Sequence, residues 1–325
     1  MKRVIITGAA GFLGSHLAKE LVAKGCDVIG IDNLSTGLRA NVRDLEGKPN
    51  FRFVERDVTS IEPAIEPEFA GVTEIYHLAS PASPKFYQAS PLETIAANTL
   101  GTRNMLEVAR CLQAKFLFAS TSEVYGDADV HPQPEDYCGK INTWGPRACY
   151  YEAKRLGEVY CFEYYRIHQV RMRIARIFNT YSAGLRNDDG RVISNFLTQA
   201  LNGEEITVYG DGQQTRCFCY VDDTVRGLQA MMESEAAEGQ IFNIGNPVDY
   251  TILEIAQLIK HMIASDSAIT FCPLPADDPR QRCPSIEKAK QILGWEPKID
   301  LEEGLRRTIA AYKRALAGET RDENG

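Results

Sequence analysis

The chain has 325 residues, of which 44% are hydrophobic and 25% are charged, and its mean hydropathy is −0.26. These values are ordinary for a soluble globular protein and exclude a disordered chain, a collagen-like repeat and a bilayer protein. The net charge of −8 argues against a nucleic-acid partner, because polyphosphate binders carry a basic face that replaces counterions. No stretch approaches the roughly 18 apolar residues of a membrane span, so we expect a cytoplasmic protein with no membrane partner.

Short apolar runs alternate with helical patterns through the first half of the chain. Helices are predicted at 94–111 and 151–168, and strands at 4–6, 28–31, 51–54, 74–77, 116–119 and 170–174. This alternation predicts an α/β fold with a doubly wound parallel sheet of the Rossmann type. Ligands of such sheets lie at the carboxyl ends of the strands.

The second half is less regular, with loops rich in Gly, Asp and Asn and helices predicted at 193–201, 252–264 and 301–316. This pattern predicts a smaller C-terminal lobe that binds the substrate and closes over a cleft. The expected boundaries are 1–176 for the first domain, with 217–245 returning to it, 177–216 and 246–317 for the lobe, and 318–325 for a frayed polar tail.

The nine cysteines and five histidines include no CxxC pair and no HExxH or other ligand spacing. Metal centres and disulfide frameworks need repeated short spacings that bring their ligands to one point. The sequence therefore predicts reduced thiols and no metal site.

A GxxGxxG turn follows the first strand and opens the first helix. Its glycines, Gly8, Gly11 and Gly14, permit a tight turn and let backbone N–H groups approach a pyrophosphate at the positive end of the helix. Alone, the motif also fits an ordinary strand-to-helix turn. However, Asp32 ends the second strand, where a carboxylate accepts hydrogen bonds from the adenosine ribose. Because that carboxylate repels a ribose 2′-phosphate, the two features predict NAD rather than NADP.

Tyr150 and Lys154 are four residues apart at the start of a predicted helix, so both side chains can point into one cleft. A nearby ammonium group favours the phenolate, which lets a tyrosine act as a base below its ordinary pKa of about 10. The strand before this helix presents Thr121 to the same crevice. Tyr151 is the competing tyrosine, but Arg155 lies on its side of the helix and that side faces another direction.

Five longer segments carry a resemblance to a known family: HLASPASP at 77–84, STSEVYG at 120–126, GPRACY at 145–150, DGRV at 189–192 and DDPRQR at 277–282. From Lys2 to about Ala315 the chain resembles the extended short-chain dehydrogenase/reductases that act on nucleotide sugars, and within them the UDP-glucuronate decarboxylase (UDP-xylose synthase) family. Sugar 4,6-dehydratases of this superfamily carry Thr-Asp-Glu where this chain has Thr-Ser-Glu. Ser122 therefore argues against dehydration.

The resemblance implies NAD-dependent decarboxylation of UDP-glucuronate to UDP-xylose through a 4-keto intermediate, with NADH recycled internally. The catalytic residues that it implies are Thr121, Glu123, Tyr150, Lys154 and Arg282. The implied cofactor-binding residues are Gly8, Gly11, Phe12, Leu13, Gly14, Asp32, Asn33, Asp57, Val58, Leu78, Ala79, Tyr150 and Lys154. The implied substrate-binding residues are Ser80, Pro81, Tyr87, Ser122, Asn179, Arg191, Tyr209, Gln214, Arg216 and Arg282.

Some of these assignments have open alternatives. Asp57 either brackets the adenine or caps a helix, and Glu123 either transfers a proton near C5 or only orients Tyr150 or a water. Arg282 is expected near the sugar carboxylate; its alternative is a solvated residue of a charged loop. Turn-forming or surface roles are the alternatives for Asn179, Arg191, Tyr209 and Arg216.

One departure from the family concerns the loop after the Asn-Thr-Tyr of residues 179–181. Relatives usually continue with Gly-Pro-Arg, whereas this chain has Ser-Ala-Gly at 182–184 and its next arginine is Arg186. The exact sugar specificity is therefore open. The rival functions are a nucleotide-sugar 4-epimerase or 4,6-dehydratase and a catalytically silent NAD-binding sensor. The resemblance also implies a homodimer, formed through the helix at 94–111 and the catalytic helix.

Overall fold

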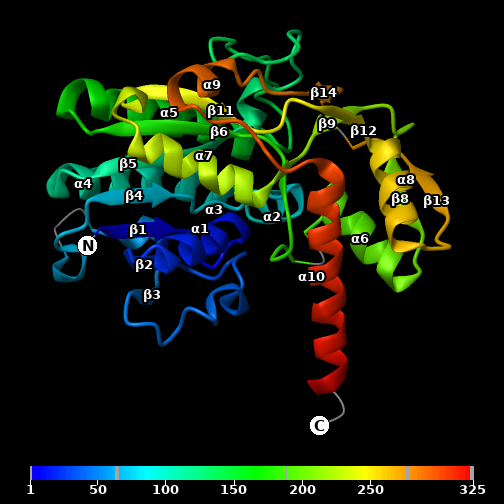
Figure 1. Cartoon of the computed structure of the whole chain (residues 1–325). Coiled ribbons are helices and arrows are strands. Elements are labelled where there is room, and N and C mark those ends of the chain that lie inside the picture. The colour runs from blue at the N-terminus through cyan, green and yellow to red at the C-terminus, as the bar shows by residue number, and fades with distance from the viewer. Residues whose placement is uncertain (1, 63–65, 187–188, 276–278, 323–325) are drawn as a thin grey trace.

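The computed structural model describes residues 2–62, 66–186, 189–275 and 279–322, with side chains described up to residue 314 (Figure 1). Its centre is a seven-stranded sheet in the order β11-β6-β5-β4-β1-β2-β3, and every pairing in it is parallel. The strands are β1 (Arg3–Thr7), β2 (Asp27–Asp32), β3 (Phe51–Glu55), β4 (Glu74–His77), β5 (Lys115–Thr121), β6 (Met172–Ile177) and β11 (Gln240–Ile244). This sheet confirms the predicted doubly wound fold.

Both faces of the sheet are covered because successive side chains of a strand point to opposite faces. In β1, Val4 and Ile6 join one hydrophobic cluster and Ile5 joins the other. The first cluster lies under α1 (Phe12–Ala23) and α7 (Val221–Glu233). The second lies under α4 (Thr102–Leu112) and α5 (Ala148–His168), which pack against each other. Each apolar run in the sheet is therefore buried on two sides, as the sequence pattern indicated.

The helix predicted at 94–111 is divided into parts. It consists of α3 (Pro91–Ala96), a π-helical segment at Ala97–Gly101 and then α4. The π-helical segment approaches its neighbour closely: a Cβ on Gly101 would lie 2.5 Å from Cγ2 of Val58. Close packing of this kind cannot be read from helical periodicity.

Two further boundaries differ from the sequence prediction. β6 begins at Met172 rather than at 170, because α5 ends at His168 and the left-handed backbone of the next residue, Gln169 (φ 58°), starts a turn. α10 (Leu301–Asp322) runs past its predicted end at 316, so the expected frayed tail is helical up to Asp322. Residues 323–325 of that tail lie outside the described residues.

The remaining elements form the smaller lobe, which lies on the right in Figure 1, and segments that lie against the large sheet. They are α2 (Pro84–Ala89), β7 (Thr180–Tyr181), α6 (Val192–Asn202), β8 (Ile206–Tyr209), β9 (Thr215–Cys217), β10 (Cys219–Tyr220), β12 (Asp249–Thr251), α8 (Ile252–Ile263), β13 (Ile269–Cys272), β14 (Gln281–Arg282) and α9 (Glu287–Leu293). Small sheets join β12-β9-β14, β13-β8 and β10-β7. The lobe thus carries β9 and β14 toward the carboxyl end of the large sheet.

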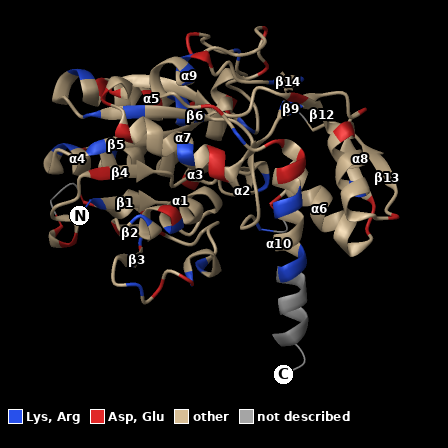
Figure 2. Cartoon of the chain, viewed as in Figure 1, with Lys and Arg blue, Asp and Glu red and all other residues tan. Residues whose placement is uncertain are grey.

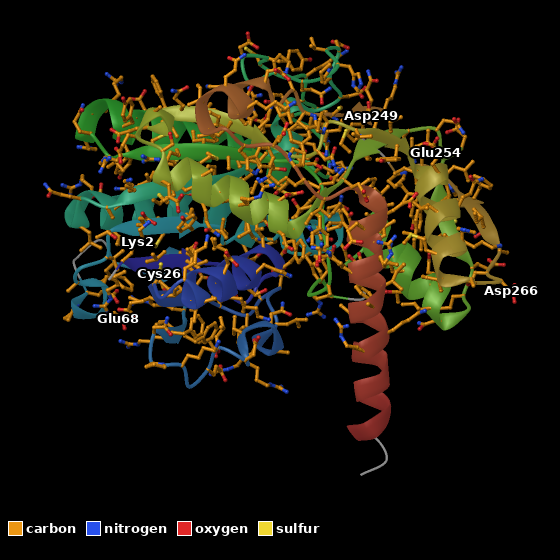
Figure 3. The ribbon with its side chains drawn as sticks, viewed as in Figure 1. Lys2, Cys26, Glu68, Asp249, Glu254 and Asp266 are labelled. Atoms are coloured by element: carbon orange, nitrogen blue, oxygen red, sulfur yellow. The ribbon has the colours of Figure 1, made fainter. Side chains whose placement is uncertain are left out.

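Local sequence signals account for where two of the long helices begin. α8 starts in a capping box, in which Glu254 N donates to Thr251 Oγ1 (3.1 Å) and Thr251 N donates to Glu254 Oε2 (2.7 Å); Figure 3 marks Glu254 at this end. α10 starts with Glu302 and Glu303, whose negative charges are stabilised by the positive end of the helix dipole. Basic residues follow along the helix (Figure 2). Among the described residues, no helix is long and apolar enough to cross a membrane.

Candidate active site

A cleft of about 380 Å³ opens at the carboxyl ends of β1, β2, β4, β5 and β6, beside the smaller lobe. It lies at the switch point between β1 and β4, where the strand order reverses and where open α/β sheets bind ligands. The residues singled out in the sequence that line it are Gly8, Gly11, Phe12, Leu13, Gly14, Asp32, Asn33, Asp57, Val58, Leu78, Ala79, Ser80, Pro81, Thr121, Ser122, Glu123, Tyr150, Lys154, Asn179, Arg191, Arg216 and Arg282.

The floor of one end of the cleft is the glycine-rich turn before α1. Gly8 has φ +71°, and a Cβ there would lie 2.9 Å from the backbone N of Ala79. A Cβ on Gly14 would lie 2.0 Å from the carbonyl oxygen of Gly8. Side chains at these positions would collide with the backbone, so only glycine allows this tight turn, whose N–H groups stand at the positive end of α1 where a phosphate binds.

Asp32 ends β2 in the same part of the cleft and is buried. Its Oδ2 accepts a hydrogen bond from Ala10 N (2.9 Å) and its Oδ1 accepts one from Leu34 N (2.8 Å). Burial raises the pKa of this carboxyl, while the backbone donors oppose that rise. Each oxygen keeps a lone pair for a ribose hydroxyl. The glycine turn and Asp32 therefore fit an adenine dinucleotide without a 2′-phosphate.

The structure shows the capping role of Asp57, while its contact with the adenine stays a prediction. It caps a 3₁₀ helix at Val58–Ser60 by accepting a bond from Thr59 N (2.7 Å), and it also lines the cleft. Asn33 Nδ2 donates to its second oxygen (2.6 Å). Burial alone would raise the pKa of Asp57, but the hydrogen bonds from Thr59 and Asn33 lower it, so the group stays a carboxylate.

Tyr150 stands in the first turn of α5 and is hydrogen-bonded to Thr121 at the end of β5. Its ring is stacked on Tyr87, with 4.9 Å between the ring centroids and 2° between the planes. Burial raises the pKa of Tyr150 to about 12, and the bond to Thr121 opposes this rise. The phenol is thus held in the cleft with its oxygen next to a hydroxyl side chain.

Lys154 is in the same cleft as Tyr150, as the spacing predicted, and its ammonium group is bonded to the backbone. Its Nζ donates to the carbonyl oxygen of Ala119 (2.6 Å) and lies 5.9 Å from the centroid of the Tyr150 ring. Burial lowers the pKa of Lys154 to about 7. Burial is the largest influence on both groups, since it raises the pKa of Tyr150 and lowers that of Lys154, and the effect of Lys154 on the tyrosine stays a prediction.

A second group of charged residues lies beside the phenol. Glu123 is between two arginines: its Oε2 is 3.0 Å from Nη2 of Arg147, and its Oε1 contacts Nη1 of Arg282. Burial alone would raise the pKa of Glu123, but the guanidinium groups of Arg282 and Arg147 outweigh it and hold the pKa at about 2. Glu123 is therefore a carboxylate at neutral pH.

Arg282 uses only part of its hydrogen-bonding capacity. Its Nη1 faces Glu123, whereas Nε and Nη2, which form one edge of the guanidinium group, are buried and have no hydrogen-bond acceptor among the described residues. The residue is 3% exposed and lines the cleft. An edge with two parallel N–H groups matches a carboxylate in a bidentate pair.

The cations expected to hold a diphosphate lie on the lobe side of the cleft. Arg216, in β9, is buried, and its Nη2 donates to the carbonyl oxygen of Pro279 (2.7 Å). Arg191 immediately precedes α6 and pairs with Asp189. Asn179 lies between β6 and β7. Arg186, which follows the altered loop, also lines the cleft, so a cation is present there despite the departure in sequence.

Three of the predicted substrate-binding residues do not line the cleft. Tyr87 is buried, and its ring is stacked on the Tyr150 ring and supports it. Tyr209 is half-exposed at the end of β8, and Gln214 Nε2 donates to its carbonyl oxygen (2.7 Å). Their assignment as ligands stays a prediction.

Arg147 was missed as a site residue, although it lines the cleft and pairs with Glu123. Its signal in the sequence was its place directly before the helix that carries Tyr150 and Lys154. Asp277 and Asp278 of the fifth motif lie outside the described residues.

The fold and the cleft define a class of protein. Residues 4–245 match the model of the NAD dependent epimerase/dehydratase family, and the chain belongs to that family of extended short-chain dehydrogenase/reductases. Among solved structures, it is similar to a UDP-glucose 4-epimerase of Thermotoga maritima (TM-score 0.89, 31% identity, 97% of this chain and 99% of that one). It is also similar to a UDP-glucuronic acid 4-epimerase of Bacillus cereus in complex with UDP-glucuronic acid and NAD (TM-score 0.88, 28% identity, 96% and 99% of the two chains).

A narrower assignment comes from a curated relative. UDP-glucuronic acid decarboxylase 1 of Danio rerio is 51% identical over 315 residues, which are 97% of this chain and 73% of the relative. Within the wider family, the chain therefore belongs to the UDP-glucuronic acid decarboxylases.

Proposed function

We propose that this chain converts UDP-glucuronate to UDP-xylose and CO2. The observation that carries the proposal concerns Arg282, which lines the cleft together with Tyr150 and Glu123: its buried Nε and Nη2 have no acceptor among the described residues. A uronic acid offers a carboxylate to that edge. A hexose with a 6-hydroxyl group offers only one weaker acceptor and would leave a buried donor unpaired, which is costly.

The glycine turn, Asp32 and Asp57 would hold the dinucleotide. NAD is favoured over NADP because the Asp32 carboxylate repels the charge of a 2′-phosphate. When bound, NAD supplies a reversible hydride acceptor and a positive charge. The residues of this chain do the remaining work: they orient the sugar, move its protons and hold its carboxylate.

Proton transfer from the 4-hydroxyl group of the sugar is assigned to Tyr150. Thr121 is hydrogen-bonded to the phenol and orients the sugar hydroxyl toward it. Because burial raises the pKa of Tyr150 to about 12, the phenol needs positive charge close by before it can accept this proton. Lys154 and the bound cofactor are the sources of that charge.

Decarboxylation follows from the position of the new ketone. A carbonyl at C4 is β to the C6 carboxylate, so loss of CO2 leaves an enolate rather than a free carbanion. Tyr150 and Thr121, the donors that held the hydroxyl, then stabilise the enolate oxygen. Arg282 fixes the carboxylate until the C5–C6 bond breaks.

Glu123 is assigned a positioning role in this scheme. With its pKa held at about 2, it carries no proton to give to C5 at neutral pH. Its two oxygens instead orient Arg282 and Arg147. Protonation of C5 is left to water or to Tyr150.

The test of the proposed function is incubation of the purified chain with UDP-glucuronate and NAD, followed by proton NMR of the product. We expect a UDP-pentose and one CO2 for each sugar consumed. A UDP-hexuronate with inverted C4 would instead show an epimerase. Binding of NAD without turnover would show a silent sensor, and a 6-deoxy-4-keto sugar from a UDP-hexose would show a dehydratase.

An Arg282→Lys variant tests the carboxylate assignment. Lysine keeps the charge that faces Glu123 but cannot form the two-pronged pair, so we expect KM for UDP-glucuronate to rise by about 30-fold, corresponding to about 2 kcal/mol. Arg280→Lys is the matched control, since the Arg280 side chain is 90% exposed and should leave KM unchanged. An unchanged KM in the Arg282 variant would contradict the assignment.

We further propose that the chain is a homodimer. Apolar side chains are exposed on α3 and α5: Leu92, Ile95, Leu156, Val159 and Phe162. These helices pack side by side, so the residues form one surface that a second copy would bury.

The location of the chain in the cytoplasm also stays a proposal; it is supported by the nine cysteines, all of them described and all free thiols.

Introducing negative charge into the exposed apolar surface of α5 tests the proposed dimer. We expect Val159→Glu/Phe162→Glu to be a monomer by light scattering at micromolar concentration, because two carboxylates would be buried without partners. Phe271→Glu is the matched control, since Phe271 is equally exposed on β13 of the smaller lobe. A monomeric unaltered chain, or a dimeric double variant, would refute the proposed interface.

A further inference from the structure

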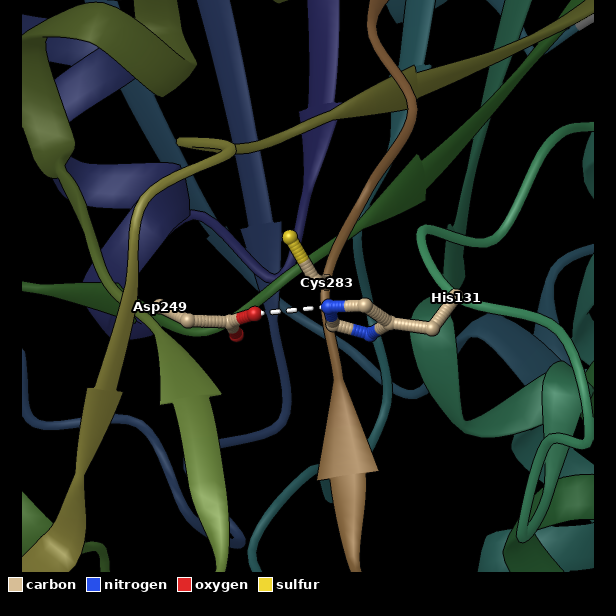
Figure 4. Close-up of side chains that lie close together, drawn as sticks. All are labelled: His131, Asp249 and Cys283. Carbon is tan, nitrogen blue, oxygen red and sulfur yellow. Dashed lines mark ion pairs between the residues drawn. The ribbon is translucent and has the colours of Figure 1, made fainter.

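Four side chains that ligate metals meet at one point behind the cleft. His131 comes from the loop after β5, Cys217 from the end of β9, Asp249 from the start of β12 and Cys283 from the residue after β14. Figure 4 shows the His131 and Asp249 side chains pointing toward each other with Cys283 beside them, and Figure 3 marks Asp249 in the smaller lobe. These positions are far apart in the sequence, which is why no ligand spacing was visible there.

The ligand atoms are already close together. One atom each of His131, Asp249 and Cys283 lies within 4.8 Å of the others, and His131 Nε2 is 2.8 Å from Asp249 Oδ2. Cys217 Sγ donates to Asp249 Oδ1 (3.1 Å) and Cys283 Sγ donates to the carbonyl oxygen of Pro247 (3.3 Å), and the two thiols are neighbours. The cluster thus offers one nitrogen, one carboxylate and two sulfurs.

Strand pairing and one glutamine create this arrangement. Asp249 and Cys217 face each other in the antiparallel β12–β9 ladder. β14 runs parallel to β9 with Arg282 beside Arg216, so the next residues are the two cysteines. Gln133 ties the His131 loop to the same place, since its N donates to Cys283 O and its Oε1 accepts from Cys283 N (both 2.8 Å). The site is therefore preorganised.

We propose that His131, Cys217, Asp249 and Cys283 bind one Zn²⁺ or a similar thiophilic divalent cation. Four ligands of types N, O, S and S suit the tetrahedral coordination of zinc, and the two thiols favour it over magnesium or calcium. On binding, the ion replaces the two thiol protons, so the net charge of the cluster is unchanged. His131 is exposed while Cys283 is buried, which gives the ion a path from solvent.

The cluster lies on the same strands as two arginines of the cleft, so a bound ion would affect the cleft. Successive residues of a strand point to opposite faces, so Arg216 and Arg282 face the cleft while Cys217 and Cys283 face the cluster. A bound ion would link β9, β12, β14 and the His131 loop. It would therefore fix the two strands that carry these cleft arginines.

The test uses Co²⁺ and Zn²⁺ alone on the full chain, after treatment with a chelator and a phosphine reductant. We expect one Co²⁺ per chain, with the intense visible absorption of a tetrahedral thiolate site, and displacement of that absorption by Zn²⁺. Zn²⁺ should also raise Tm. His131→Asn should weaken Co²⁺ binding by about 100-fold or more, since even loss of a residue that only supports a ligand costs up to about that.

Controls separate this site from other thiols. His131 is at the surface, so His131→Asn should fold even if Cys283→Ser does not, and circular dichroism checks both. His261→Asn and Cys138→Ser replace residues outside the cluster and should bind as the unaltered chain does. The proposal is overturned by the absence of thiolate absorption, by absorption that survives in both cluster variants, or by a Cys217–Cys283 disulfide in the reduced, metal-treated protein.

Discussion

Replacing Tyr150 with phenylalanine is expected to lower kcat for UDP-glucuronate by about a thousandfold, within the range that loss of a general acid–base group produces. The variant loses the only group in the scheme that accepts the proton of the 4-hydroxyl. The phenylalanine ring keeps the stacking on Tyr87, so the fold and the affinity for NAD should stay unchanged. Steady-state release of CO2 gives kcat, and calorimetric titration with NAD gives the affinity.

Tyr164→Phe is the matched control for this prediction. Tyr164 is on the same helix and is buried, and its hydroxyl donates to Glu107 Oε1 (2.6 Å) outside the cleft. It should keep kcat within a factor of about two, because it touches none of the cleft residues. If Tyr150→Phe kept a tenth or more of the activity, Tyr150 would not be the base.

The second large effect is expected for Glu123→Gln, as a loss of stability. Its carboxylate is buried between two guanidinium groups, and glutamine would leave both of them without a counter-ion. We expect the free energy of unfolding at pH 7 to fall by about 3 kcal/mol, the order found when one partner of a buried ion pair is removed. Urea unfolding of the two chains measures it.

The pH dependence of this difference follows from the pKa of Glu123. The folded value of about 2 is below the ordinary value of 4.5, so the carboxylate stabilises the fold fully above pH 4.5. That stabilisation is lost as the pH falls from 4.5 toward 2. The gap between the unaltered and Glu123→Gln chains should therefore be constant from pH 7 to about 5 and should narrow below that.

Glu152→Gln supplies the comparison. Glu152 is on the surface of α5, where its pair with Arg155 is long (3.8 Å) and 41% of its side chain is exposed. Its replacement should change the free energy of unfolding by less than about 0.5 kcal/mol at any of these pH values. A Glu123→Gln chain as stable as this control would show that the two arginines do not depend on the carboxylate.

The parts of the site that the sequence could place are those built from contiguous residues. The glycine turn and Asp32 lie at fixed points of a strand–turn–helix unit, and Tyr150 and Lys154 are one helical turn apart. Such local geometry follows from backbone rules. The same rules predicted the fold class, because alternating strands and helices can form little other than a parallel sheet.

The electrostatics of the site could not be predicted in this way. Lys154 has the expected position, yet its ammonium group bonds to a backbone carbonyl and burial governs its pKa. Arg147 and Glu123 are separated by a long loop, and Arg282 comes from the other lobe, so their pairing depends on the tertiary fold. The cluster around Asp249 escaped prediction for the same reason.

The most direct measurement of the central claim uses UDP-glucuronate that carries ¹³C at C6 and deuterium at C4, with unlabelled NAD. The scheme removes the C4 hydride, loses C6 and then returns the same hydride. We therefore predict that the ¹³C appears as CO2 and that the UDP-xylose keeps its deuterium at C4. A product that retains ¹³C, or a pentose that has lost the deuterium, would contradict the proposed mechanism.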